Sequence, residues 1–125
     1  MKKIIKTSNA PLPIGPYNQA ILVGNMLFIS GQIAINPETN KLVNTDIISE
    51  TNQILNNIDA ILDEAKFSRN DIVKVSIFVK DINNFSIINE EYRKFFTEYY
   101  PARELIEVSN LPANANIEIS VIAVK

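Results

Sequence analysis

Two charged residues stand in settings that suggest chemistry. Arg103 is one of only three arginines, and it follows a Pro-Ala step at the start of a segment that reads as a strand. Its rigid guanidinium fork suits a carboxylate ligand, but the same side of that strand also offers Glu107 as an ion-pair partner. Glu118 interrupts the apolar run IEISVIAV. It is either an exposed residue at a strand end or a partly buried acid that can hold or deprotonate a water.

Four further residues carry weaker signals. Tyr17 lies in the proline-pinned loop IGPYNQ, where it either anchors the loop or offers its hydroxyl to a ligand. Ser30 and Gly31 follow an apolar strand, and a glycine there permits close backbone approach. Asn89 lies near the inner stripe of an expected helix, as a helix-side hydrogen bonder or as a site residue. None of these patterns is specific when taken alone.

Composition restricts the chemistry that is available. The 125 residues include no histidine and no cysteine. Ser-His-Asp and Cys-His nucleophile systems, the usual zinc and iron ligand sets and disulfides are therefore excluded. Catalysis would have to use carboxylates, tyrosine, lysine, arginine, backbone amides and bound water.

Charge and hydropathy indicate the compartment and exclude some partners. The net charge is −2, and no basic cluster extends beyond Lys2, Lys3 and Lys6, which disfavours a nucleic-acid-binding surface. No apolar run approaches the length of a membrane span, and the first residues lack the apolar core of a signal peptide. We expect a cytoplasmic protein without a membrane association.

Periodicity predicts the elements that must position these residues. Apolar residues at helical spacing predict helices over about 46–65 and 84–99, the second with an inner stripe that runs from Phe85 to Tyr99. Gly24-Asn25 predicts a tight hairpin, and Gly31 is expected to break its second strand. Alternation predicts strands over 71–80, with Val73 on the same face as Val75, and over 103–109 and 116–124. Residues 2–6 read as an edge strand, 9–19 as an ordered loop and 36–45 as a surface turn.

This order of elements predicts a single α+β domain over residues 1–125, with one mixed sheet covered on one face by two helices. Two helices leave the other face uncovered, yet strands 71–80 and 116–124 carry apolar residues on both faces. An open apolar sheet face exceeds what monomers normally expose. We therefore expect another copy of the chain to bury it.

Several motifs in order resemble the YjgF or Rid (reactive intermediate deaminase) family. They are IGPYNQA (14–20), FISGQI (28–33), IFVKDINNFSIINEEY (77–92), PAR (101–103) and NLPANANIEISVIAV (110–124). The resemblance implies a chorismate-mutase-like fold, a homotrimer and three clefts between subunits. It also implies deamination of enamines and imines, such as 2-aminoacrylate and 2-iminopropionate, to 2-oxoacids and ammonia, with no metal and no cofactor.

The resemblance assigns roles to the candidate residues. Arg103 corresponds to the arginine that binds the substrate carboxylate, and Glu118 to the glutamate that positions or activates water. Tyr17, Ser30, Gly31 and Asn89 correspond to residues that shape the cleft.

The chain departs from the family pattern directly after the arginine. By alternation Leu105 should line the cleft beside Arg103, and Glu104 should point away, unless a bulge brings its carboxylate onto the guanidinium. These two residues favour an alternative hypothesis, a non-catalytic module that binds a small 2-oxo or amino acid or regulates an enzyme. An RNA-directed role, as a translation inhibitor or ribonuclease, is the third hypothesis, and the acidic composition argues against it.

Overall fold

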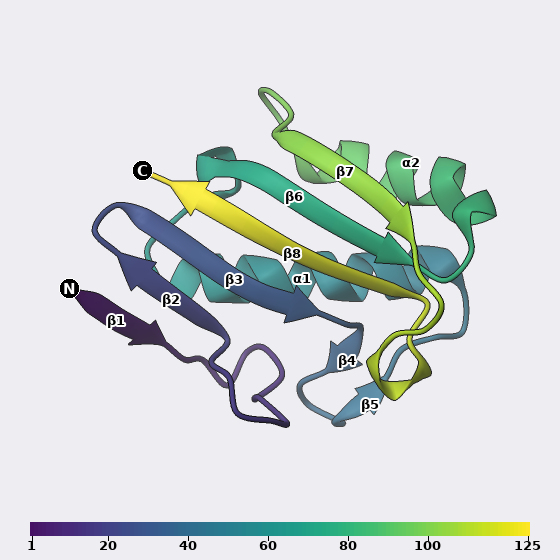
Figure 1. Ribbon diagram of the computed structural model, residues 1–125, viewed down its shortest axis with the longest axis horizontal. Coiled ribbons are helices and arrows are strands. Elements are labelled where there is room, and N and C mark those ends of the chain that lie inside the picture. The colour runs from purple at the N-terminus through teal and green to yellow at the C-terminus, as the bar shows by residue number, and fades with distance from the viewer.

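The computed structural model describes residues 1–125 as a sheet backed by two helices (Figure 1). The strands are β1 (Lys2–Ile5), β2 (Ala20–Val23), β3 (Met26–Gln32), β4 (Ile35–Asn36), β5 (Lys41–Leu42), β6 (Ile72–Val79), β7 (Ala102–Glu107) and β8 (Ile117–Val124). The helices are α1 (Ile47–Glu64) and α2 (Phe85–Phe95), and both lie on the same side of the sheet. The predicted α+β class is confirmed. No helix is both long enough and apolar enough to span a membrane.

The main sheet has the strand order β1-β2-β3-β8-β6-β7. The β6 and β7 strands are parallel and the other neighbours are antiparallel, so the sheet is mixed. The β1 strand lies at the edge, as expected. Residues 36–45, expected as a surface turn, instead contribute to a small β4-β5 hairpin outside the sheet.

Helix α1 follows its prediction closely. Its N-cap is Asp46, whose carboxylate accepts a hydrogen bond from the Ser49 backbone, and its apolar stripe is buried against the sheet. Helix α2 is shorter than the predicted 84–99, because Phe96 already has an extended backbone. Phe96 still packs into the core, whereas Phe85 and Tyr99 at the ends of the expected stripe are 44% and 59% exposed.

The hairpin turn between β2 and β3 forms at Gly24 with φ +58°, as expected. Strands β3 and β6, however, contain irregularities that the sequence pattern did not predict. Gly31 does not end its strand: β3 continues to Gln32, and its register against β8 shifts between Ile29 and Gln32. A second shift, in β6, buries Ile72 together with Val75 and exposes Val73, so Val73 does not share the environment of Val75 as predicted.

The two faces of the sheet differ in what covers them. The face toward the helices holds the core, including Ile77, Ile119 and Val121. The opposite face has no layer over it (Figure 1). By strand alternation it carries exposed apolar side chains, namely Ile4, Val23, Met26, Phe28 and Ile106. We call this surface the open face.

Candidate functional site

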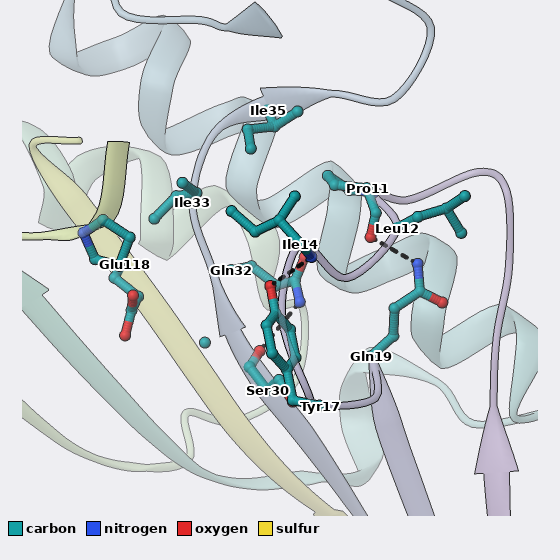
Figure 2. Close-up of a pocket in the computed structure, with 12 residues that line it drawn as sticks. Pro11, Leu12, Ile14, Tyr17, Gln19, Ser30, Gln32, Ile33, Ile35 and Glu118 are labelled. Carbon is teal, nitrogen blue, oxygen red and sulfur yellow. Dashed lines mark hydrogen bonds between the residues drawn. The ribbon is translucent and has the colours of Figure 1, made fainter. Parts of the chain in front are cut away.

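A hollow of about 330 Å³ lies beside β3, β8 and the loop before β2 (Figure 2). We call it the Glu118 hollow. It contains four of the predicted site residues: Tyr17, Ser30, Gly31 and Glu118. Residues from three separate segments are thus brought to one place, whereas Arg103 and Asn89 lie elsewhere.

Gly31 and Glu118 are in unusually close contact. A Cβ atom at position 31 would lie 2.6 Å from Glu118 Oε2 and 2.8 Å from its Cδ. The carboxylate therefore rests directly against the β3 backbone, in space that only glycine leaves free. This close approach explains the Ser-Gly step at the register shift of β3, because any side chain there would displace the acid.

The setting of Glu118 changes its acidity. Burial raises the pKa of the Glu118 carboxyl above its ordinary value of 4.5. No cation is paired with it. A carboxylate with a raised pKa binds a proton more readily, which suits a group that takes a proton from water and passes it on.

A buried glutamine fixes the loop that carries Tyr17. The Gln19 amide donates to the backbone carbonyls of Thr7, Ala10 and Pro11, and its carbonyl accepts from the Thr7 amide. The Tyr17 hydroxyl in turn accepts a 3.4 Å hydrogen bond from the Ile14 amide (Figure 2). Nothing in the sequence marks Gln19, because its hydrogen-bond partners come together only in the folded loop.

Ser30 ties this loop to the sheet. Its hydroxyl donates to the Asn18 carbonyl at 2.6 Å, and its backbone amide donates to the Gln19 carbonyl at 2.9 Å. The Ser30 side chain is thus engaged within the chain. Its main contribution is to hold Tyr17 and Gly31 in fixed relation across the hollow.

Much of the remaining wall is apolar. The residues that supply it are Leu12, Ile14, Ile33, Ile35 and Pro112, together with Pro11. Sequence reasoning missed this wall, since these residues look like ordinary loop and core residues. A small ligand with an apolar side chain fits such a surface, with polar groups at one end to orient it.

A second, more open hollow of about 260 Å³ lies at the end of β7 and along α2. We call it the Arg103 hollow. It is lined by Asn89, Tyr92, Arg93, Tyr100, Pro101 and Arg103. Asn89 and Arg103, both predicted site residues, are therefore brought together here.

Aromatic rings, not a carboxylate, hold the Arg103 side chain. Its guanidinium carbon lies 4.8 Å from the centre of the Tyr92 ring and 5.8 Å from that of Phe85. The ion pair considered with Glu107 does not form, and Glu107 instead accepts from the Ile82 amide. Contact through the ring faces leaves the in-plane N–H donors of the guanidinium available for a ligand.

The two residues after Arg103 point in opposite directions. Glu104 lies on the open face, where it accepts a hydrogen bond from Ser76 and pairs with Lys74 at 3.0 Å. These partners lower the pKa of the Glu104 carboxyl. Glu104 thus points away from Arg103, as alternation predicted. Leu105 lies on the side of Arg103, but it packs against the core and does not line either hollow.

The two hollows lie on opposite sides of the sheet. Arg103 is in register with Val75, which is in register with Val121, and these three positions face the helices. Glu118 is an odd number of residues from Val121 on β8, so it faces the other way. Within one chain Arg103 and Glu118 therefore cannot reach the same small ligand.

A buried acid on α1 fixes the start of β8. The Glu50 side chain is fully buried, and it accepts hydrogen bonds from the Asn116 backbone and side-chain amides, both at 2.8 Å, and from the Ile117 amide at 3.3 Å. Its partners are neutral donors. Because Glu118 is the next residue after Ile117, the hydrogen bonds of Glu50 also help to fix the position of Glu118.

Fold and hollows together define a small α+β domain of the chorismate-mutase-like type, with one hollow beside β3 and β8 and another between β7 and α2. The chain belongs to the YjgF/RutC/Rid family, as its motifs indicated. The model of this family, described as Endoribonuclease L-PSP, matches residues 7–125.

Individual relatives are similar to this chain over nearly their whole length. A RutC family protein of Pyrococcus horikoshii is 53% identical over 100% of this chain and 99% of its own. The 2-iminobutanoate/2-iminopropanoate deaminase of Escherichia coli is 46% identical over 100% and 99% of the two chains. The crystal structure of a Rid family protein of unknown function from Yersinia pestis superposes with a TM-score of 0.98, at 48% identity and full coverage of both chains.

Proposed function

We propose that this protein hydrolyses reactive enamines and imines of amino acids to 2-oxoacids and ammonia. The observation that carries the proposal is the Arg103 guanidinium, which is held by ring faces and has no carboxylate partner in the chain. The deaminase name of the E. coli relative supports the same reaction. Substrates such as 2-iminopropionate carry the carboxylate that the guanidinium would bind.

We further propose that the site is completed between subunits of a homotrimer. Arg103 and Glu118 face opposite sides of one sheet, so a shared ligand requires two chains. The apolar side chains of the open face supply a reason for association, because covering them removes exposed residues such as Phe28 and Ile106 from water. In a ring of identical subunits, the Arg103 hollow of each chain would adjoin the Glu118 hollow of the next.

The residues would then divide the reaction among them. Arg103, with Asn89 beside it, would bind the substrate carboxylate through paired N–H donors. Glu118 would take a proton from a water as its oxygen adds to the imine carbon C2, and would deliver a proton to the nitrogen. The second proton of the water then moves to the nitrogen as the C2–N bond breaks, so ammonia leaves and C2 becomes the carbonyl carbon of the 2-oxoacid. Tyr17 and the Ser30-Gly31 backbone would shape the pocket around C2. Leu105 lines neither hollow of the single chain, and its role in substrate binding stays a prediction.

The test is a coupled assay in which 2-aminoacrylate is generated in situ and its disappearance is followed. We expect the wild-type protein to accelerate loss of the imine over buffer. Arg103→Ala should lower kcat/KM by about 10²–10⁴-fold, because two charge-assisted hydrogen bonds are lost. Glu118→Ala should lower kcat more than it raises KM. No acceleration by the wild-type protein refutes the deaminase proposal.

Subunit complementation tests the composite site separately. Arg103→Ala and Glu118→Ala chains, each inactive, would be unfolded together and refolded at equal amounts. In a ring with head-to-tail contacts, about one quarter of the sites then combine an intact arginine with an intact glutamate, so about a quarter of the activity returns. If the mixture stays as inactive as its components, Arg103 of one subunit and Glu118 of another do not act together in one site.

An RNA-directed function is the alternative, and the description of the family model as an endoribonuclease favours it. The net charge of −2 and the lack of histidine speak against this alternative. Incubation with single-stranded RNA distinguishes the two: cleavage lost in Glu118→Ala would support the nuclease. The cytoplasmic location expected from the sequence stays a prediction.

A further inference from the structure

Tyr92 presents a buried polar group with no partner. It lies on α2, its side chain is only 5% exposed, and its hydroxyl oxygen is shut off from solvent without any hydrogen bond. Buried hydroxyls are almost always bonded, since an unpaired one lowers stability. Phenylalanine would fill the same space without that penalty. The hydroxyl therefore indicates a partner from outside the chain.

The surroundings of Tyr92 indicate what that partner is. Tyr92 lines the Arg103 hollow, and its ring lies 4.8 Å beneath the Arg103 guanidinium. Another charged residue of this hollow, Arg93, is occupied in an ion pair with Glu90. A hydroxyl donor beside a free guanidinium is suited to an anion with two oxygens, such as a carboxylate.

The two groups differ in how far they can move. The Tyr92 ring is fixed in the core, where it packs on Phe96 with ring centres 4.9 Å apart. Arg103 has a long flexible stem and stays partly exposed. A ligand that draws the guanidinium outward would open the space above the ring, and the hydroxyl would become reachable.

We propose that the Tyr92 hydroxyl is a second donor to the carboxylate that Arg103 binds. This inference rests on the proposed function, and it adds a substrate-binding residue that the sequence analysis did not single out. Tyr92 would then help to select ligands with an acid group next to the reacting carbon. It would contribute to binding of the carboxylate and not to the chemistry at C2.

The hydroxyl keeps its proton under all ordinary conditions. Burial raises the pKa of Tyr92 to about 12, despite the opposing effect of the Arg103 charge. Tyr92 therefore remains a hydrogen-bond donor up to about pH 10, and its contribution to binding should not change between about pH 6 and pH 10.

Tyr92→Phe tests the proposal because it removes only the hydroxyl. The variant should bind 2-oxobutanoate, a product-like carboxylate, about tenfold more weakly in a calorimetric or NMR titration. Its KM for the imine should rise by a similar factor while kcat changes little. Without ligand it should melt at a higher temperature than the wild type, because an unpaired buried hydroxyl has been removed. A hydroxyl with only a structural role would not, on removal, weaken ligand binding and at the same time raise the melting temperature.

Tyr99→Phe is the matched control. The Tyr99 hydroxyl donates to the Asn70 carbonyl at 3.1 Å, and Tyr99 does not line either hollow. Its loss should leave the affinity for 2-oxobutanoate unchanged. A neutral ketone, 2-butanone, should show no difference between Tyr92→Phe and the wild type.

The outcomes separate this inference from the proposed function. If the wild type turns over imines but Tyr92→Phe binds 2-oxobutanoate equally well, the hydroxyl inference is wrong and the deaminase stands. If the wild type is inactive on imines, yet 2-oxobutanoate binds and Tyr92→Phe weakens it, the hydroxyl inference stands and the deaminase is wrong. If Tyr92→Phe changes only subunit dissociation, the hydroxyl's partner is a neighbouring chain, and the inference is overturned.

Discussion

Replacement of Gly31 by alanine should slow catalysis strongly without unfolding the protein. The new Cβ would lie 2.6 Å from Glu118 Oε2, whereas ordinary contacts begin near 3.4 Å, so the carboxylate must retreat by at least about 0.8 Å. A displacement of this size at a catalytic group costs about 10²-fold in rate. We therefore expect kcat for imine hydrolysis to fall by about two orders of magnitude, with a smaller change in KM.

The effect of Gly31→Ala on stability should be small. Moving a partly exposed side chain costs about 1 kcal/mol, and the loss of glycine's freedom in the unfolded chain returns about 0.4–1 kcal/mol. Gly24→Ala is the matched control, because its Cβ has nothing within 4 Å but its φ of +58° disfavours alanine by about 1–2 kcal/mol. The control Gly24→Ala should melt at a lower temperature than the wild type and keep its rate of imine hydrolysis.

The assay is single-turnover decay of 2-aminoacrylate, run beside thermal unfolding of both variants. Gly31→Ala should lose rate and keep its melting temperature, while Gly24→Ala should do the reverse. A Gly31→Ala protein that is folded and as fast as the wild type would show that the position of the Glu118 carboxylate does not matter, and the role assigned to it would be wrong.

Three further predictions concern acidic residues. Glu118→Gln should be more stable than the wild type at pH 7.5, because the raised pKa of Glu118 means that wild-type stability falls as pH rises through that pKa. In melting curves the difference between the two proteins should vanish below about pH 4. A stability advantage of Glu118→Gln that grows in acid would contradict the burial argument. Glu50→Ala should lower the free energy of unfolding, measured in urea, by about 3–5 kcal/mol, because the Asn116 and Ile117 donors lose their buried acceptor. Glu50→Gln should lower this free energy by less, and equal losses in the two variants would refute this account. Glu104→Ala should change the affinity for 2-oxobutanoate by less than about twofold, because Glu104 faces away from Arg103, and a tenfold change would place it in the site.

Local signals in the sequence predicted most elements correctly. Helix α1 was evident from its periodicity, and the hairpin from Gly24, because both depend on neighbouring residues alone. The ordered motifs predicted the family, which the comparisons confirmed. Two of the errors, at Gly31 and Val73, fell where register shifts in β3 and β6 arise from pairing with β8. Such shifts depend on distant partners and leave no local pattern.

The candidate site divides in the same way. Residue types and motifs identified Arg103 and Glu118, and alternation correctly turned Glu104 away from the arginine. Gln19, Glu50 and Tyr92 were missed. The partners of Glu50 are 66 and 67 residues away, and the significance of Tyr92 is a missing bond, which a sequence cannot display.

The sequence by itself determined the family, the α+β class and the set of groups available for chemistry, since these depend on composition and on residues close together in the chain. Only the tertiary structure decided how those groups are combined. The register of β6, β7 and β8 directs Arg103 to the helix side of the sheet and Glu118 to the other. Side chains alternate across a strand, so a single residue of register decides which face a charge occupies. That register makes the proposed site one that two copies of the chain must share.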